Sequence, residues 1–80
     1  MFPKIKSVEV FKDIKLKITF EDDIKKIYDC YTIMQEEPFN RLKDKALFKN
    51  VHVDSGGYGI SWSDDLDLSE SELWTHGEDF

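Results

Sequence analysis

The side chains best suited to chemistry are concentrated in one stretch, VHVDSGGYGISWSDDLDLSESELW, which runs from Val51 to Trp74. Its three closely spaced glycines raise the question of a phosphate-binding loop. Such a loop needs a lysine and a Ser or Thr directly afterwards, at the start of a helix. No lysine follows Gly59 in this chain. The glycine pair after Ser55 therefore indicates a turn between two strands, where glycine adopts a positive φ without a Cβ penalty.

The aspartates that follow, Asp64, Asp65 and Asp67, raise the question of a cation site. An EF-hand needs spaced oxygen ligands, a central glycine and a glutamate at the twelfth position, and this pattern is absent. Ligand chemistry alone leaves a weak surface cation site open, but we predict no metal and no cofactor. Asp67 is better suited to accept backbone hydrogen bonds in a loop that precedes the last helix.

The candidate nucleophile and bases are isolated in the sequence. Cys30 is the single cysteine, and His52 and His76 have no second His or Cys at ligand spacing. Cys30 has no sequence context that pairs it with a histidine base, so a buried thiol is the ordinary expectation. We therefore predict that the chain is not an enzyme.

Charge is distributed unevenly along the 80 residues, whose formal net charge is −6. All 11 basic residues lie in residues 1–50, whereas residues 51–80 hold eight acidic residues and no Lys or Arg. An acidic chain repels nucleic-acid phosphates, so we expect no direct nucleic-acid binding. The acidic third suits a basic protein partner, or simply a solvated surface.

The compartment is inferred from what the sequence lacks. No segment has the roughly 18 apolar residues that a membrane span needs, and lysines interrupt the N-terminal residues MFPKIKSVEVF. A single cysteine cannot form an intrachain disulfide and fits a reducing compartment. We expect a cytoplasmic chain with no membrane contact.

Hydrophobic periodicity predicts one α+β domain over residues 1–80. In KLKITFE, Leu16, Ile18 and Phe20 alternate with polar residues, which is the period of a half-buried strand. Ser69 and Glu72 have capping-box spacing and predict the start of a C-terminal helix. The remaining elements are strands at 4–10, 24–31, 51–54 and 58–62, a turn at 21–23, and short helical pieces near 33–34 and after Pro38. We expect a small bent antiparallel sheet of about five strands: a three-stranded meander, a short helix and a hairpin, with the C-terminal helix packed on it.

This order of elements, with these residues, resembles the domain of unknown function 2442 family of bacteria and phages. The matching residues are Ile5, Lys6 and Val8; Phe20-Glu21-Asp22; Ile27-Tyr28-Asp29; Phe39, Leu42, Lys43 and Asp44; Phe48; Val51-His52-Val53-Asp54; Ile60-Ser61-Trp62; Leu66-Asp67-Leu68; and Leu73-Trp74. The resemblance implies a compact α+β fold with a strongly bent sheet and no catalytic residues. Some relatives are fused to helix-turn-helix domains and others are encoded beside toxin-like genes, which implies an accessory or antitoxin-like role.

The sequence departs from the family pattern at three places. Asp23 replaces a usual glycine, Thr32 replaces a usual proline, and Ser63-Asp64-Asp65 replaces a usual Pro-Asn-Gly. We expect the first turn and the loop before Asp67 to differ in shape from those of the relatives. The replacements also make this chain more acidic.

We therefore expect a small, non-catalytic protein-binding module, with an antitoxin-like neutraliser as its most concrete form. Its expected partner is a protein, basic if it meets the acidic third, and a homodimer through an open sheet edge is compatible with the pattern. The candidate partner-binding residues are Trp62, Asp64, Asp65, Asp67 and Trp74. Both tryptophans are also expected to close the core, since we expect the eleven aromatic residues to form the interior.

Two other classes of function are left open by the sequence. One is a regulatory module of a DNA-binding assembly, or an acidic mimic of nucleic acid. The other, more remote, is an uncharacterised enzyme. A deep pocket that gathers Asp54, Asp67 and a histidine would favour the enzyme.

Overall fold

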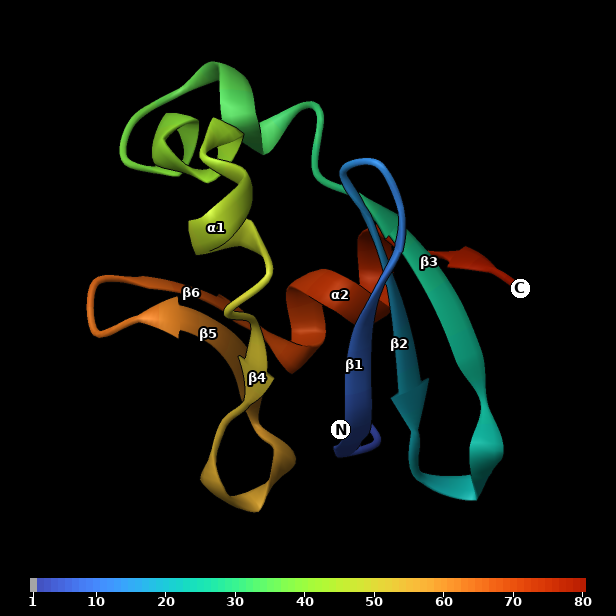
Figure 1. The fold of residues 1–80 in the computed structure, drawn as a ribbon. Helices are drawn as coiled ribbons and strands as arrows, with labels where there is room; N and C mark the ends of the chain where they lie inside the picture. Colours follow the sequence, from blue (N-terminus) through green and yellow to red (C-terminus); the bar gives the residue numbers. More distant parts are fainter. Residues whose placement is uncertain (1) are drawn as a thin grey trace.

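The computed structural model describes residues 2–80, which form two antiparallel sheets with a short helix between them (Figure 1). The first sheet has the order β1-β2-β3-β7, with β1 at Ile5–Lys12, β2 at Lys15–Phe20, β3 at Lys25–Asp29 and β7 at Glu78–Asp79. The second has the order β4-β5-β6, with β4 at His52–Val53, β5 at Gly59–Ser63 and β6 at Leu66–Ser69. The helices are α1 at Lys45–Phe48 and α2 at Glu70–His76, and the 3-10 turns are η1 at Glu21–Asp23, η2 at Ile33–Gln35, η3 at Phe39–Lys43 and η4 at Ser55–Gly57. The predicted α+β class and three-stranded meander are confirmed.

Strand β2 lies in the middle of the first sheet because its sequence has one fully apolar face. Leu16, Ile18 and Phe20 are completely buried, and the residues between them point to the other face. Each is paired across the sheet, with Leu16 opposite Tyr28 and Val10. The alternation in the sequence was therefore a sufficient signal for this strand.

Strand β6 was predicted as an acidic loop, and this prediction is wrong. Leu66 and Leu68 are buried against the interior, while Asp67 points outward opposite Ser61 of β5. Four residues of apolar-polar alternation are too few to stand out beside two aspartates, but pairing with β5 stabilises them as a strand. The carboxylate of Asp67 accepts no hydrogen bond from residues 2–80, so its predicted role before the helix is also wrong.

The strand predicted at 58–62 would place Tyr58 on the same inward face as Ile60 and Trp62, but Tyr58 is 60% exposed. The strand begins at Gly59, and Tyr58 closes the η4 turn with helical backbone angles. The alternation therefore does not extend back to it. Its ring instead lies 4.1 Å from Lys4 Nζ, in a cation–π contact at the surface.

The two ends of α2 are fixed by local sequence. Ser69 Oγ accepts a hydrogen bond from the backbone N–H of Glu72 at 3.2 Å, so the predicted helix start is confirmed. After the helix, Gly77 leads into β7, which pairs with β3 and places Asp79 opposite Lys26. The C-terminal residues are thereby attached to the first sheet as a fourth strand that the sequence did not indicate.

The interior uses fewer aromatic side chains than expected. Phe20, Tyr28, Phe48 and Trp62 are buried, and Phe39 and Trp74 are partly buried against them. The other five aromatic residues of the chain are exposed: Phe2, Phe11, Tyr31, Tyr58 and Phe80. The prediction that all eleven aromatics form the interior is wrong, because aliphatic residues from both sheets supply the rest of the core.

Burial of Cys30 predicts a dependence of stability on alkaline pH. Burial, followed by the charge of Asp29, raises the pKa of the Cys30 thiol to about 12 from an ordinary value of 9.0. As the pH rises, the thiol of the unfolded chain therefore loses its proton before the thiol of the folded chain does. The contribution of Cys30 to the free energy of unfolding is fully present below pH 9 and is lost as the pH rises toward 12. We expect the free energy of unfolding to fall by about 2 kcal/mol between pH 9 and 10.5 from this group.

Urea unfolding at a series of pH values measures this effect. The variant Cys30→Ala should show a shallower alkaline decline than the wild type, whatever its stability at pH 8. Equal slopes for the two proteins would contradict the inferred burial of the thiol. Tyr28, whose pKa is also raised by burial and by its bond to Glu72, adds a decline of the same sign above pH 10 in both proteins.

Candidate binding groove

A groove of about 520 Å³ opens where β3, α2 and β7 meet. We call it the acidic groove. It is lined by Lys15, Ile27, Tyr28, Asp29, Thr32, Ile33, Glu72, His76 and Glu78. These residues come from both ends of the sequence, and the fold brings them together because α2 packs against β3 and the chain then returns as β7.

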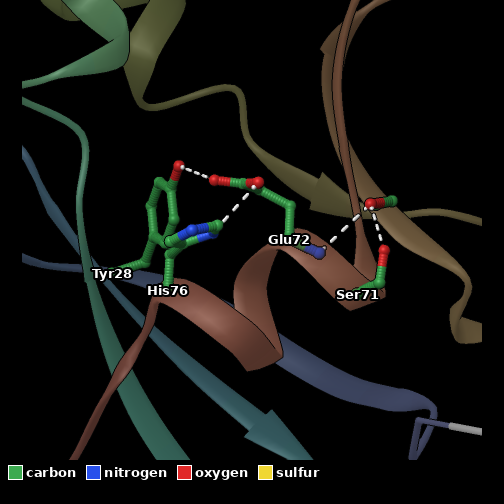
Figure 2. A network of polar contacts seen from close by, with 5 residues as sticks. Tyr28, Ser71, Glu72 and His76 are labelled. Atoms are coloured by element: carbon green, nitrogen blue, oxygen red, sulfur yellow. Dashed lines mark hydrogen bonds and ion pairs between the residues drawn. The ribbon is translucent and has the colours of Figure 1, made fainter.

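Three side chains form a connected polar network at one wall of the groove (Figure 2). Tyr28 Oη donates a hydrogen bond to Glu72 Oε2 at 2.9 Å. The other carboxylate oxygen, Oε1, lies 3.2 Å from His76 Nδ1, one helical turn further along α2. The carboxylate of Glu72 is therefore held between a phenol and an imidazole, and its orientation is fixed before anything binds.

The network extends from the interior to solvent. The Tyr28 ring is buried, the side chain of Glu72 is 35% exposed, and that of His76 is 63% exposed. Burial and the bond to Glu72 raise the pKa of Tyr28, so its hydroxyl remains a proton donor throughout the neutral range. The ring of His76 is open to solvent at the mouth of the groove.

The charge of the groove favours a cationic ligand. Asp29, Glu72 and Glu78 supply three carboxylates against the single ammonium of Lys15, a balance of −3 + 1 = −2 with His76 neutral. Asp29 and Glu78 are exposed, whereas Glu72 is partly shielded from water. A partly desolvated carboxylate attracts a positive group more strongly than an exposed one.

Catalysis is less well supported by the same groups. The Glu72–His76 pair could orient a histidine base, but a nucleophile must lie within hydrogen-bond reach of that base. The Cys30 thiol is fully buried and remains protonated. Ser71 Oγ bonds Ser69 Oγ on another side of α2, as Figure 2 shows. Thr32 lines the groove, yet no hydrogen bond joins it to His76 within residues 2–80. The arrangement is therefore better suited to binding than to covalent chemistry.

The residues predicted to bind a partner do not form one site. Trp62 is 1% exposed and packs against Phe48 and Phe39, so it closes the core as expected and cannot contact a partner. Trp74 is half-buried on α2, with Lys26 Nζ 4.6 Å from its ring.

The three aspartates of that prediction lie on the β5–β6 hairpin, which leads into α2 (Figure 1), and none of them lines the acidic groove. Asp65 accepts hydrogen bonds from Ser63 Oγ at 2.8 Å and from Arg41 Nη1 at 2.9 Å. These two contacts lower the pKa of Asp65. One carboxylate of the hairpin is therefore already paired within the chain, which leaves Asp64 and Asp67 exposed.

The acidic groove was missed from the sequence for a physical reason. The four-residue spacing of Glu72 and His76 on one helix was a usable signal that both side chains share a face. Nothing local indicates Tyr28, which is 44 residues distant from Glu72 along the chain. His76 is exposed, and its sequence neighbours include no second His or Cys at ligand spacing.

The part of the chain that the structure describes has neither a metal-ligand cluster nor a membrane-spanning helix. Among residues 2–80, no group of three or more His, Cys, Asp or Glu side chains is placed to hold a metal ion. Within the same residues, no helix has the length and apolar character to cross a membrane.

The fold and the groove define a small α+β domain with an open polar groove. The chain belongs to the family described as Protein of unknown function (DUF2442), whose pattern matches residues 5–79, nearly its whole length. Comparisons with curated proteins and with solved structures found no match.

Proposed function

We propose that this chain is a small, non-catalytic protein-binding module whose acidic groove receives a basic side chain of its partner. The observation that carries the proposal is the Glu72 carboxylate, which Tyr28 and His76 hold in a fixed orientation at a groove with an excess of negative charge. A Lys or Arg side chain entering the groove would meet Glu72, with Asp29 and Glu78 at the rim. Its apolar stem would lie along Ile27 and Ile33.

Such a site supplies specificity as well as attraction. The groove presents a positioned hydrogen-bonding carboxylate, and Arg makes the strongest contacts of this kind because its guanidinium can bond two oxygens at once. The most concrete form of the proposal is an antitoxin-like module that neutralises a basic partner in the bacterial cytoplasm. The eight acidic residues of the last 30 positions support this form, and so does the toxin-like gene context that the family resemblance implies.

Capture experiments with a tagged chain test the proposal. The bait is exposed to a lysate of the organism that encodes it at about 50 mM salt, where electrostatic contacts are least screened, and bound proteins are identified by mass spectrometry. The test variant is Glu72→Gln with Glu78→Gln. Glutamine can preserve the hydrogen bonds of Glu72 while two negative charges are removed. We expect this variant to capture at least tenfold less of the partner than the wild type does.

The matched control is Asp64→Asn with Asp67→Asn, which removes two charges from the β5–β6 hairpin. This variant should retain the partner. If only the hairpin variant failed to capture the partner, the proposal would be contradicted. The contact would then lie at the aspartates of the hairpin, which were predicted from the sequence. If the wild type captured no protein that higher salt releases, binding through charge would be contradicted.

A further inference from the structure

A second groove, of about 390 Å³, lies between the β1–β2 hairpin and the segment η3–α1. We call it the basic groove. It is lined by Val10, Asp13, Ile14, Leu42, Lys43, Lys45, Phe48 and Lys49. It shares no residue with the acidic groove.

The sign of its charge is opposite to that of the acidic groove. Lys43, Lys45 and Lys49 stand against the single carboxylate of Asp13, a balance of +3 − 1 = +2. All three lysines are exposed, and within residues 2–80 none of them is in an ion pair. Three free ammonium groups around one groove in an acidic chain form a local surface that attracts negative charge.

The floor of the groove is apolar. Leu42 and Phe48 are buried members of the core whose atoms reach the groove, and Ile14 is half-buried beside them. Val10 is 39% exposed on the last part of β1. A ligand that fits this surface must therefore have apolar groups to cover the floor as well as negative charge to pair with the lysines.

The wall of the groove is formed by the end of an edge strand. β1 is the first strand in the order of its sheet, so no strand of residues 2–80 pairs with its outer side. The beginning of β1 is covered, because Ile5 lies directly against Gly57 of the η4 turn. Val10 lies toward the other end, next to a register irregularity between Val10 and Lys12. An edge strand in this position offers free backbone groups to an added strand.

We infer that the basic groove receives an extended acidic segment of a second protein, with apolar residues between its carboxylates. Alternation of side chains along an extended segment would place one set on Leu42, Phe48 and Val10 and the other set near the lysines. Backbone pairing with the end of β1 supplies further hydrogen bonds. The inference is independent of the proposed function, because it rests on other residues and on the opposite charge.

The probe is a fluorescein-labelled octapeptide of alternating Glu and Leu, and fluorescence anisotropy measures its binding. The test variant is Lys43→Glu with Lys49→Glu. The charge-matched control is Lys6→Glu with Lys25→Glu, since these lysines flank Asp23 at η1 and do not line the groove. We expect a loss of at least tenfold in affinity for the test variant and less than threefold for the control. Circular dichroism confirms that both variants are folded.

Hydrogen exchange provides the second measurement. Binding should slow the exchange of backbone amides in residues 9–12 of the wild type. Equal loss of affinity in the two variants, or no binding of the octapeptide by the wild type, would overturn the inference. A concentration-dependent dimer that Lys43→Glu with Lys49→Glu abolishes would overturn it in favour of a second copy of the chain.

Discussion

Replacing Trp62 by alanine is expected to lower the free energy of unfolding by about 3–5 kcal/mol. Trp62 is the largest fully buried side chain, and it joins the second sheet to the helical segment. Its ring stacks on Phe48 at a centroid distance of 6.2 Å and meets Phe39 edge-on at 6.4 Å. A domain of 80 residues has a total stability of only about 5–15 kcal/mol, so this loss is large.

Tyr58→Ala is the matched control for Trp62→Ala. Alternation in the sequence placed both residues on one face, but Tyr58 lies at the surface and contacts Lys4 through its ring. We expect Tyr58→Ala to cost less than about 1 kcal/mol, the scale of one exposed cation–π contact. Urea unfolding followed by circular dichroism measures both variants. Comparable losses in the two would contradict the observed division between core and surface.

Replacing Gly57 by alanine is expected to destabilise the chain by about 2–5 kcal/mol, through strain and overpacking together. The φ angle of Gly57 is +77°, which L side chains rarely adopt. A Cβ atom there would lie 2.5 Å from the carbonyl oxygen of Ile5, a backbone atom of β1. Relief of this clash would require movement of the η4 turn away from β1 and so would separate the two sheets.

The variant Gly56→Ala separates backbone strain from overpacking. Gly56 has a similar φ of +83°, but a Cβ there would meet only the outer atoms of the flexible Tyr58 ring, at 2.8 Å. We expect Gly56→Ala to cost about 1–2 kcal/mol from the backbone strain alone. Thermal unfolding of both variants gives the difference between them. A Gly56→Ala variant as unstable as Gly57→Ala would show that close packing of the turn on β1 is unimportant.

The elements that could be predicted from the sequence are those whose stability is local. Strand β2 has three consecutive core positions in strict alternation, and α2 begins at a serine that caps its own helix. Strands β6 and β7 have no comparable local signal. They are two to four residues long and are stabilised by pairing with β5 and β3, which the sequence does not display.

The candidate site was less predictable than the fold. Carboxylates that cluster in the sequence, at Asp64 and Asp65, lie together in the turn of the β5–β6 hairpin and not in the groove, and Asp65 is paired with Arg41. The carboxylate at the wall of the groove is that of Glu72, which contacts Tyr28 and His76 and which the sequence indicates only as part of a helix cap. Its partner Tyr28 comes from a strand that is distant in the chain, so only the packing of α2 on β3 brings the two together.

The most direct test of the account is a map of the contact surface by nuclear magnetic resonance. The ¹⁵N-labelled chain is titrated with the captured partner, and changes in backbone amide shifts are assigned to residues. A basic side chain in the acidic groove predicts that the largest changes occur at Tyr28, at residues 72–76 and at Glu78. Changes confined to the β5–β6 hairpin, or no changes at saturating partner, would contradict the proposal.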